Sequence, residues 1–351
     1  MSRVLAAIRP FLPFLVAIPI LAVVEATTTP YQNIVLVTVG VNVILAVSLN
    51  VVNGFTGQFS LGHAGFMSVG AYTTAKITLA LANVKISGLP EAVSDHLIFA
   101  IALGAGMAMA ALAGLLVGLP SLRLKGDYLA IVTLGFGEII RSVIENLPFL
   151  GAALGLSGLP IRTNLVWVGV GAVATAVMAR RLAVSTQGRA LFAIREDEVA
   201  AEAMGVDTTG YKVRAFVISA AYAGVAGGLL VHVIGSVSPG NFNFVRSIEV
   251  VVMVVLGGLG SITGSILSAT ILTFALEWLR EFQAYRMVVY ALLLIVLMLL
   301  RPQGLFGTRE LWDLPFLRRF LRARGLPVPA RAAGAPPTAV RDDREVPGGH
   351  A

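Results

Sequence analysis

The stretch STQGRALFAIREDEVAAEAMGVDTTGYKVR, residues 185–214, is a hydrophilic island between two long apolar segments. It holds four basic and five acidic side chains, and no other stretch between residues 26 and 300 is as densely charged. A helix needs about 20 apolar residues to cross a bilayer, and the segments on either side approach that length. The pattern predicts a membrane protein with one large polar loop, here termed the island, between two of its spans.

The composition agrees with this interpretation. The chain of 351 residues is 57% hydrophobic and only 13% charged, whereas soluble proteins carry about 25% charged residues. The mean hydropathy is +0.85. Such a chain cannot cover itself with polar surface, so we expect an all-α, polytopic integral membrane protein. The sequence contains no cysteine, which excludes disulfides, thiolate metal sites and cysteine nucleophiles.

Ten apolar segments follow one another along the chain, which predicts about ten transmembrane helices. The short eighth segment, Ile248–Leu256, is the weak point, and a broken or re-entrant helix is the alternative there. The segments are approximately Phe11–Thr29, Tyr31–Val52, 63–81, Leu97–Gly118, Tyr128–Leu147, Asn164–Ala179, Val213–Ile234, Ile248–Leu256, Ile262–Leu279 and Arg286–Leu300.

The distribution of positive charge gives an orientation. With a cytoplasmic N-terminus, ten crossings place the 119–127 loop, the island and the C-terminal tail on the cytoplasmic side. Only seven of the 26 lysines and arginines then fall elsewhere, as the positive-inside rule requires. The net charge of +7 therefore indicates membrane topology rather than nucleic-acid binding. We expect a transmembrane domain over residues 1–307 and a basic, partly disordered cytoplasmic tail over 308–351.

Two glycine-rich breaks interrupt the apolar segments, one in each half of the chain. VVNGFTG (residues 51–57) matches VVLGGLG (254–260) at four of seven positions. Paired breaks of this kind indicate the central site of a transporter, because helix ends present free backbone groups to a substrate. Close packing through glycine is the alternative. The predicted lining of a translocation path includes Gly57, Gln58, Ser60, Gly62, His63, Gly257 and Gly260.

A charged cluster on the fifth segment is a second candidate. Glu138, Arg141 and Glu145 are spaced three and four apart and share one helical face. Charges within a membrane span are costly, so Glu138 and Arg141 should pair with each other or line a wet path. A structural clip, part of the path or gate, and a proton relay all remain possible interpretations of the pair.

The island itself predicts a helix that starts at Ser185 or Thr186, runs through Arg189–Met204 and ends at Gly205. Phe192, Val199 and Ala203 would share one face of this amphipathic helix. Such a helix either lies on lipid or docks into a groove on a soluble partner. The acidic run 196–198 disfavours anionic lipid, which favours a protein partner.

The absence of several sequence motifs narrows the range of functions that the chain can have. The sequence contains no G-x-x-x-x-G-K-[ST], so the chain does not bind ATP through a P-loop, and no H-E-x-x-H or G-x-S-x-G that would indicate hydrolysis. A transport subunit without an ATPase site of its own is the leading hypothesis. The alternatives are an autonomous ion-coupled carrier that uses Glu138 and Arg141, and an intramembrane enzyme that uses His63 or His232.

Five motifs resemble the permease subunit of bacterial branched-chain amino acid ABC importers, the LivM-type subunit. They occur in that family's order and cover most of the chain from about residue 40 to 307. The motifs are GFTGQFSLGHAGFMSVGAYTTA (54–75), KGDYLAIVTLGFGEIIR (125–141), GRALFAIREDEVAAEAMGVD (188–207), GGLGSITG (257–264) and RPQGLFG (301–307).

The resemblance implies that residues 185–212 form a cytoplasmic coupling loop that docks on an ATPase. It implies two ATP-binding cassette subunits, a second homologous permease and a periplasmic amino acid-binding protein as partners in the inner membrane, with no cofactor. The implied substrates are leucine, isoleucine and valine, although urea and amide permeases share much of the pattern. The implied ATPase contacts are Gly188, Arg189, Arg195, Glu196, Asp197, Ala200, Met204 and Gly205.

Overall fold

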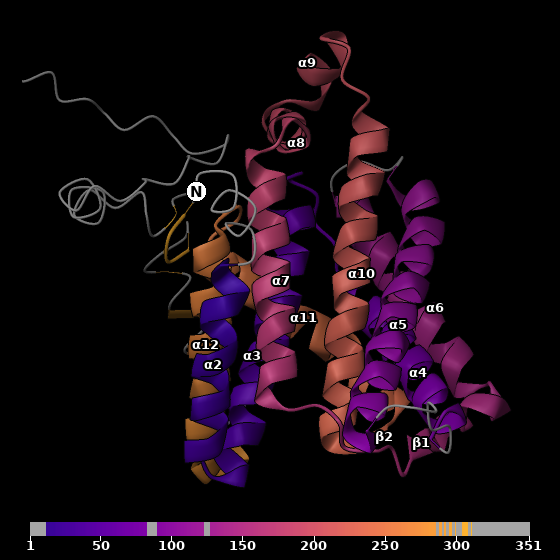
Figure 1. Cartoon of the computed structure of the whole chain (residues 1–351). Coiled ribbons are helices and arrows are strands. Elements are labelled where there is room, and N and C mark those ends of the chain that lie inside the picture. The colour runs from indigo at the N-terminus through magenta and orange to yellow at the C-terminus, as the bar shows by residue number, and fades with distance from the viewer. Residues whose placement is uncertain are drawn as a thin grey trace, which may run out of the picture.

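The structure is a computed structural model that describes residues 12–82, 90–122, 127–285, 304–307 and 310, with some residues between 288 and 299. Most of these residues belong to long helices that run side by side (Figure 1). The long helices are α2 (Leu12–Thr27), α3 (Pro30–Asn53), α4 (His63–Ala80), α5 (Glu91–Ser121), α6 (Asp127–Glu145), α7 (Leu165–Val184), α10 (Thr208–Ile234), α11 (Phe244–Gly257) and α12 (Ile262–Trp278).

Short elements occupy the two ends of the bundle. The island forms α8 (Thr186–Glu196) and α9 (Glu198–Ala203), which lie together at one end (Figure 1). At the other end, β1 (Leu156–Ser157) pairs antiparallel with β2 (Ser236–Val237) (Figure 1). The remaining elements are the 3₁₀ helices η1 (Pro148–Leu150), η2 (Ala152–Leu154), η3 (Pro239–Phe242) and η4 (Leu279–Tyr285).

The all-α membrane architecture is confirmed. Among the described residues, six helical segments are long and apolar enough to cross a membrane, and α2 is a shorter apolar helix. The expected total of ten spans stays a prediction, because most of the tenth segment and the tail after residue 310 lie outside the described residues.

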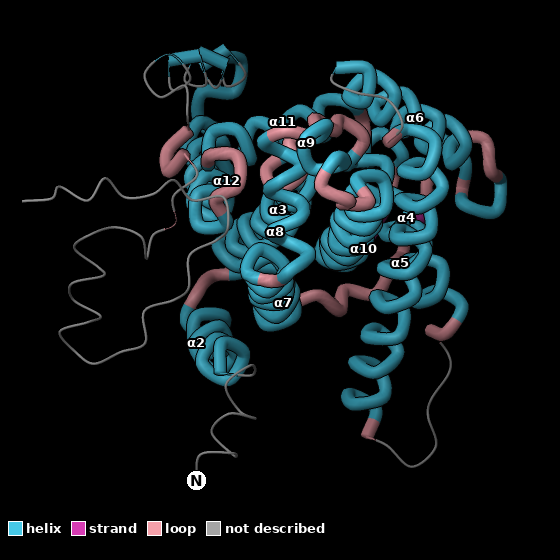
Figure 2. The backbone as a smooth tube through the Cα atoms, turned by 90° about the horizontal axis from the view of Figure 1, so that it is seen from above, coloured by secondary structure: helices cyan, strands magenta, loops and turns pink. Residues whose placement is uncertain are grey.

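Helices α3 and α10 lie near the middle of the bundle, with α2, α6 and α12 toward its edges (Figure 2). Glycine allows α4, α5 and α10 to approach one another closely. A Cβ at Gly70 of α4 would lie 2.2 Å from the Cα of Gly224 in α10. A Cβ at Gly106 of α5 would lie 2.3 Å from the hydroxyl of Thr74 in α4.

The island does not form the single helix that the sequence predicts. The chain leaves helical geometry at Asp197, where φ is −157° and ψ is 109°. The Asp197 carboxylate accepts hydrogen bonds from the backbone N–H groups of Val199 and Ala200, so it caps a new helix instead of continuing the old one. The predicted shared face is therefore wrong: Phe192 is 5% exposed and Val199 is 68% exposed.

The helix after the island starts earlier than the sequence predicts. Asp207 caps α10 by accepting a hydrogen bond from the Gly210 N–H at 3.0 Å. The seventh apolar segment begins at about Val213, whereas α10 runs unbroken from Thr208 to Ile234. One continuous helix therefore connects the island to the opposite end of the bundle.

Candidate functional site

The two glycine breaks lie against each other at the island end of the bundle. Helix α3 ends at Asn53 and α11 ends at Gly257, and each break leads into the next helix. The buried Asn50 side chain joins the breaks, because its amide N–H₂ donates to the Ser261 carbonyl at 3.0 Å and its oxygen accepts from the Gly260 N–H at 2.9 Å. This region, residues 50–62 and 257–261, is termed the junction.

Arg195 connects the island to the junction. The Arg195 side chain points inward from the last turn of α8, and its Nη1 donates to the Gly54 carbonyl at 2.8 Å. The same nitrogen lies 3.5 Å from the Leu259 carbonyl, at the limit of a hydrogen bond. Phe192 adds an apolar contact, with its ring centroid 5.1 Å from that of Phe55. One arginine therefore reaches both breaks from the polar loop.

Glycine at the junction is required by space and by backbone geometry. A Cβ at Gly54 would lie 2.3 Å from the Gly260 nitrogen. Gly260 itself has a φ of +92°, which side-chain-bearing residues rarely adopt, and a Cβ there would lie 2.7 Å from Arg195 Nη1. Gly54, together with Gly260 of the predicted path lining, therefore lets the two breaks and the arginine meet.

The far part of the first break is held by side chains from three helices. The Ser60 N–H donates to the Asn53 amide oxygen, the Leu61 N–H to the Thr133 hydroxyl of α6, and the Ala64 N–H to the Ser247 hydroxyl of α11. These bonds pair backbone groups that a broken helix leaves open inside a membrane. Gln58 and Gly62 lie in the same segment; Gln58 is buried, and a Cβ at Gly62 would lie 2.3 Å from the Thr133 carbonyl.

The two buried histidines have structural partners. His63 lies 3.0 Å from the Ser48 hydroxyl, and His232 lies 2.8 Å from both the Thr78 hydroxyl and the Gly228 carbonyl. Within the described part of the chain, no cluster of three or more His, Asp or Glu side chains could hold a metal ion. This arrangement favours a packing role for both rings.

A segment beyond the tenth apolar stretch returns to the junction. The Leu305 and Phe306 N–H groups donate to the carbonyls of Leu256 and Gly257. The Glu310 carboxylate, 2% exposed, accepts from the backbone N–H groups of Ile262 and Thr263 at 2.8 and 3.0 Å and from the Thr263 hydroxyl at 2.6 Å. Carboxylates are stabilised at a helix N-terminus, so Glu310 fixes the start of α12 although the sequence division placed it in the tail.

The charged cluster on α6 is paired as the spacing predicts. Arg141 donates to Glu138 at 2.8 Å and to Glu145 at 2.5 Å. The three side chains are 29–38% exposed on the single-chain surface. Glu138 and Arg141 do not belong to the junction, although Thr133 of the same helix contacts it.

A second ion pair lies on α11. This helix of 14 residues is about 21 Å long, and it reaches the length of a candidate span only together with η3, over Pro239–Gly257. In its first turns, Arg246 donates to Glu249 at 2.9 Å and to the Asn42 amide oxygen at 2.5 Å, and Asn42 donates to Thr273 of α12 at 2.8 Å. Asn42 stands at the midpoint of α3, so this network lies at half the height of that helix.

The second apolar segment of the sequence, Tyr31–Val52, carries two asparagines, Asn42 and Asn50. An amide inside an apolar helix needs a partner, and this signal marks both Asn42 and Asn50. The sequence does not reveal which side chains from the second half of the chain supply the partners.

The predicted ATPase contacts divide into two groups. Gly188 is buried, where a Cβ would lie 2.1 Å from the Leu182 carbonyl, and Arg195 faces the junction. The exposed group consists of Arg189, Glu196, Asp197, Ala200, Met204 and Gly205. An ion pair from the buried Lys212 to the partly exposed Glu198, at 2.6 Å, ties α9 to α10.

Comparison with known proteins identifies relatives over most of the chain. Residues 33–298 match the family described as "Branched-chain amino acid transport system / permease component". The chain is 36% identical over 328 residues to the high-affinity branched-chain amino acid transport system permease protein LivM of Escherichia coli K12, covering 83% of this chain and 74% of that protein.

LivM of Salmonella typhimurium is 37% identical over 298 residues, which covers 75% of this chain and 67% of the relative. LivH of Escherichia coli K12, a permease protein of the same named system, is 36% identical over 128 residues, which covers 36% of this chain and 41% of the relative. No solved structure matches the chain. The family match spans well over half of the sequence. The chain therefore belongs to the family of permease components of branched-chain amino acid transport systems.

Proposed function

We propose that this chain is the membrane-spanning permease subunit of an ABC importer that moves leucine, isoleucine or valine across the bacterial inner membrane. The LivM and LivH relatives are named for branched-chain amino acid transport, which supports this substrate class. Two separate ATPase subunits drive the importer, a second homologous permease completes the membrane part, and a periplasmic amino acid-binding protein delivers the substrate. Both termini and the island lie on the cytoplasmic side.

The hydrogen bond from Arg195 to the Gly54 carbonyl carries this proposal. The chain has no P-loop of its own, so as an ABC permease it receives energy from an ATPase through a contact surface. The island projects from one end of the bundle (Figure 1), and Arg195 joins it to both glycine breaks. A partner that moves α8 therefore moves the carbonyls to which Arg195 is bonded.

The outer surface of the island suits a protein partner. Val199 is 68% exposed and Met204 is 84% exposed, beside the exposed charges of Arg189 and Glu196. Exposed apolar side chains with a charged rim are typical of protein interfaces. The ATPase covers this surface, with Arg189, Glu196, Asp197, Ala200, Met204 and Gly205 in contact and Gly188 and Arg195 beneath them.

The junction forms the cytoplasmic end of the translocation path. Gly57, Gly257 and Gly260 lie where the two breaks meet, and Gln58, Ser60, Gly62 and His63 continue the first break toward α6 and α11. The ion pairs on α6 and α11 are partly exposed, and the pair on α11 lies at half the height of α3. Each offers one positive and one negative group, which matches the two charges of an amino acid.

Reconstitution in proteoliposomes tests the function. The chain is assembled with its co-purifying permease, ATPase and binding protein, and uptake of labelled leucine, urea and a short amide is measured with and without ATP. We expect leucine uptake only when both ATP and the ATPase subunits are present. Gradient-driven uptake by the chain alone would identify an autonomous carrier, and uptake of urea or the amide in place of leucine would contradict the substrate.

A further inference from the structure

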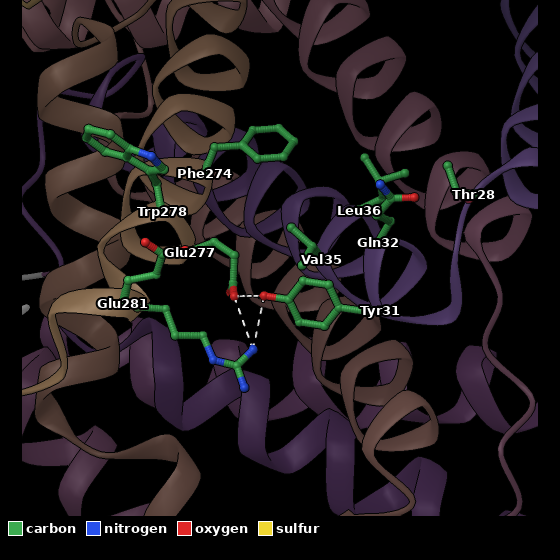
Figure 3. A pocket seen from close by; sticks show the side chains of 10 residues that line it. Thr28, Tyr31, Gln32, Val35, Leu36, Phe274, Glu277, Trp278 and Glu281 are labelled. Atoms are coloured by element: carbon green, nitrogen blue, oxygen red, sulfur yellow. Dashed lines mark hydrogen bonds and ion pairs between the residues drawn. The ribbon is translucent and has the colours of Figure 1, made fainter.

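A cavity of about 950 Å³ opens at the end of the bundle opposite the island, between the first turns of α3 and the end of α12 (Figure 3). Its lining includes no residue of the junction or of the ion pairs on α6 and α11. Nothing in the proposed transport mechanism uses it, so its chemistry requires a separate explanation.

The polar side of the cavity carries one cation and two carboxylates. Tyr31 and Glu277 point toward each other, and the Tyr31 hydroxyl donates to the Glu277 carboxylate (Figure 3). Arg280 Nη1 lies 3.0 Å from the Tyr31 hydroxyl and 3.3 Å from Glu277, and the Arg280 guanidinium stacks 5.4 Å from the Tyr31 ring centroid. Glu281 adds a second, exposed carboxylate, for which the structure shows no ion pair among the described residues.

The apolar side lies deeper along the same two helices. Val35 and Leu36 follow Tyr31 by about one turn on α3, and Phe274 precedes Glu277 by about one turn on α12. The polar groups thus stand at the helix ends and the apolar groups stand toward the middle of the membrane. Trp278 is 77% exposed and lies beside the polar groups. Tryptophan and tyrosine concentrate at membrane interfaces, so its position is consistent with the polar groups lying at the membrane surface.

We propose that this cavity binds the headgroup of a zwitterionic phospholipid with a primary ammonium group. The ammonium lies against Glu281 and Glu277, the phosphate lies against Arg280, and an acyl chain follows Val35, Leu36 and Phe274 inward. Two carboxylates against one guanidinium leave a net negative site, which disfavours an anionic phospholipid. A cavity of about 950 Å³ is also near the upper end of the range for drug-sized ligands, far larger than one amino acid needs.

Lipid binding to the full-length chain in detergent, measured by native mass spectrometry, tests this assignment. The probes are phosphatidylethanolamine, phosphatidylcholine, phosphatidylglycerol and free leucine. Phosphatidylcholine has the same charges, but its methylated ammonium has no N–H to donate. We expect phosphatidylethanolamine to bind at least tenfold more tightly than either other lipid. Equal or tighter binding of phosphatidylglycerol would overturn the proposal, and so would leucine binding at this site.

Variants of the lining residues distinguish lipid binding in this cavity from nonspecific adhesion of lipid to the protein. Glu281→Gln should weaken phosphatidylethanolamine about tenfold, because one charge-assisted hydrogen bond is lost, and should leave phosphatidylglycerol unchanged. Arg280→Gln should weaken both lipids through the phosphate. Glu25→Gln, a carboxylate near the same end of the bundle that does not line the cavity, is the matched control and should change neither. An unchanged affinity in Glu281→Gln would contradict the assignment whether or not the chain transports amino acids.

Discussion

At the scale of single residues, Asn50 holds the two halves of the junction together. Its donor and its acceptor are both used, on Ser261 and Gly260, and the side chain is 1% exposed. A buried amide that satisfies two backbone groups fixes one geometry, because any shift leaves a polar group unpaired. The contact between the breaks therefore depends on one side chain from α3.

Replacing Asn50 with leucine tests this link. Asn50→Leu keeps the apolar volume but leaves the Gly260 N–H and the Ser261 carbonyl without these partners, at about 1–3 kcal/mol for each group. We expect the free energy of unfolding in detergent to fall by about 3 kcal/mol, measured by denaturant titration. Asn146→Leu, at the exposed end of α6, is the control and should change the value by less than about 0.5 kcal/mol. Equal effects of the two substitutions would show that Asn50 does not carry the junction.

Two glycines give opposite expectations for the same substitution. Gly54→Ala places a Cβ 2.3 Å from the Gly260 nitrogen and should destabilise the chain by about 1–3 kcal/mol through overpacking. Gly135→Ala meets nothing within 4 Å in the interior of α6 and should stabilise it by about 0.5–1 kcal/mol. Thermal unfolding of the two purified variants measures the difference. Shifts of the same sign would contradict the close approach of the two breaks.

At the scale of elements, the island consists of two helices with different tasks. Helix α8 is half buried, with Leu191, Phe192 and Ile194 packed inward. Helix α9 stands outside it, and only Ala201 of its six residues is buried. Asp197 makes the bend between them. The sequence-based expectation of one helix failed at this residue because a side-chain oxygen competes with the next turn of the helix for the same N–H groups.

Two substitutions of Asp197 distinguish a role as the cap of α9 from a role as a charged contact with the ATPase. Asp197→Ala removes the cap of α9 at a cost of about 1 kcal/mol, whereas Asp197→Asn keeps a capping oxygen and removes the charge. If Asp197 acts by orienting α9, the alanine variant should bind the ATPase about fivefold more weakly and the asparagine variant should bind normally. Affinity of the purified chain for its ATPase measures this. Equal weakening of both variants would instead show that the negative charge of Asp197 itself contributes to ATPase binding, as Glu196→Lys is expected to show for its neighbour.

The start of α12 depends on Glu310, which lies 48 positions after Ile262 in the sequence and accepts a hydrogen bond from its N–H group. Glu310→Ala removes the carboxylate that accepts from Ile262 and Thr263, so their amides should exchange with solvent deuterium about tenfold faster. The Gly264 amide, which donates to Ser261 Oγ, is an internal control and should keep its rate. Unchanged exchange at Ile262 and Thr263 would show that Glu310 is not their partner.

At the scale of the whole molecule, the sequence predicts the membrane class, the island and the positions of both glycine breaks. These features are local: they depend on apolar runs, on charge density and on glycine clusters. The contacts between them are not local. Arg195 to Gly54, Arg246 to Asn42 and Glu310 to Ile262 each join residues far apart in the chain. Nothing in the spacing of one segment reveals which distant segment faces it.

The direction of Arg195 illustrates this limit. In the sequence it stands beside Glu196 and Asp197 and resembles them as a surface charge. In the folded chain the two acidic residues are exposed, whereas Arg195 turns under the island to the junction. The family resemblance grouped Arg195 with the expected ATPase contacts, and only the packing of α8 against the end of α3 separates it from them.

The ratio of ATP hydrolysed to leucine imported tests the central claim most directly. In the reconstituted complex, Arg195→Met keeps the alkyl stem but loses the bond to the Gly54 carbonyl, so the ATPase should still bind and hydrolyse ATP while import falls at least tenfold. Arg189→Met, an exposed arginine on the same helix, is the matched control: it should lower hydrolysis and import together and leave the ratio unchanged. We expect the Arg195→Met ratio to rise at least tenfold above that of the unmodified complex. A ratio equal to that of the unmodified complex would contradict the transmission of motion from the island to the junction through Arg195.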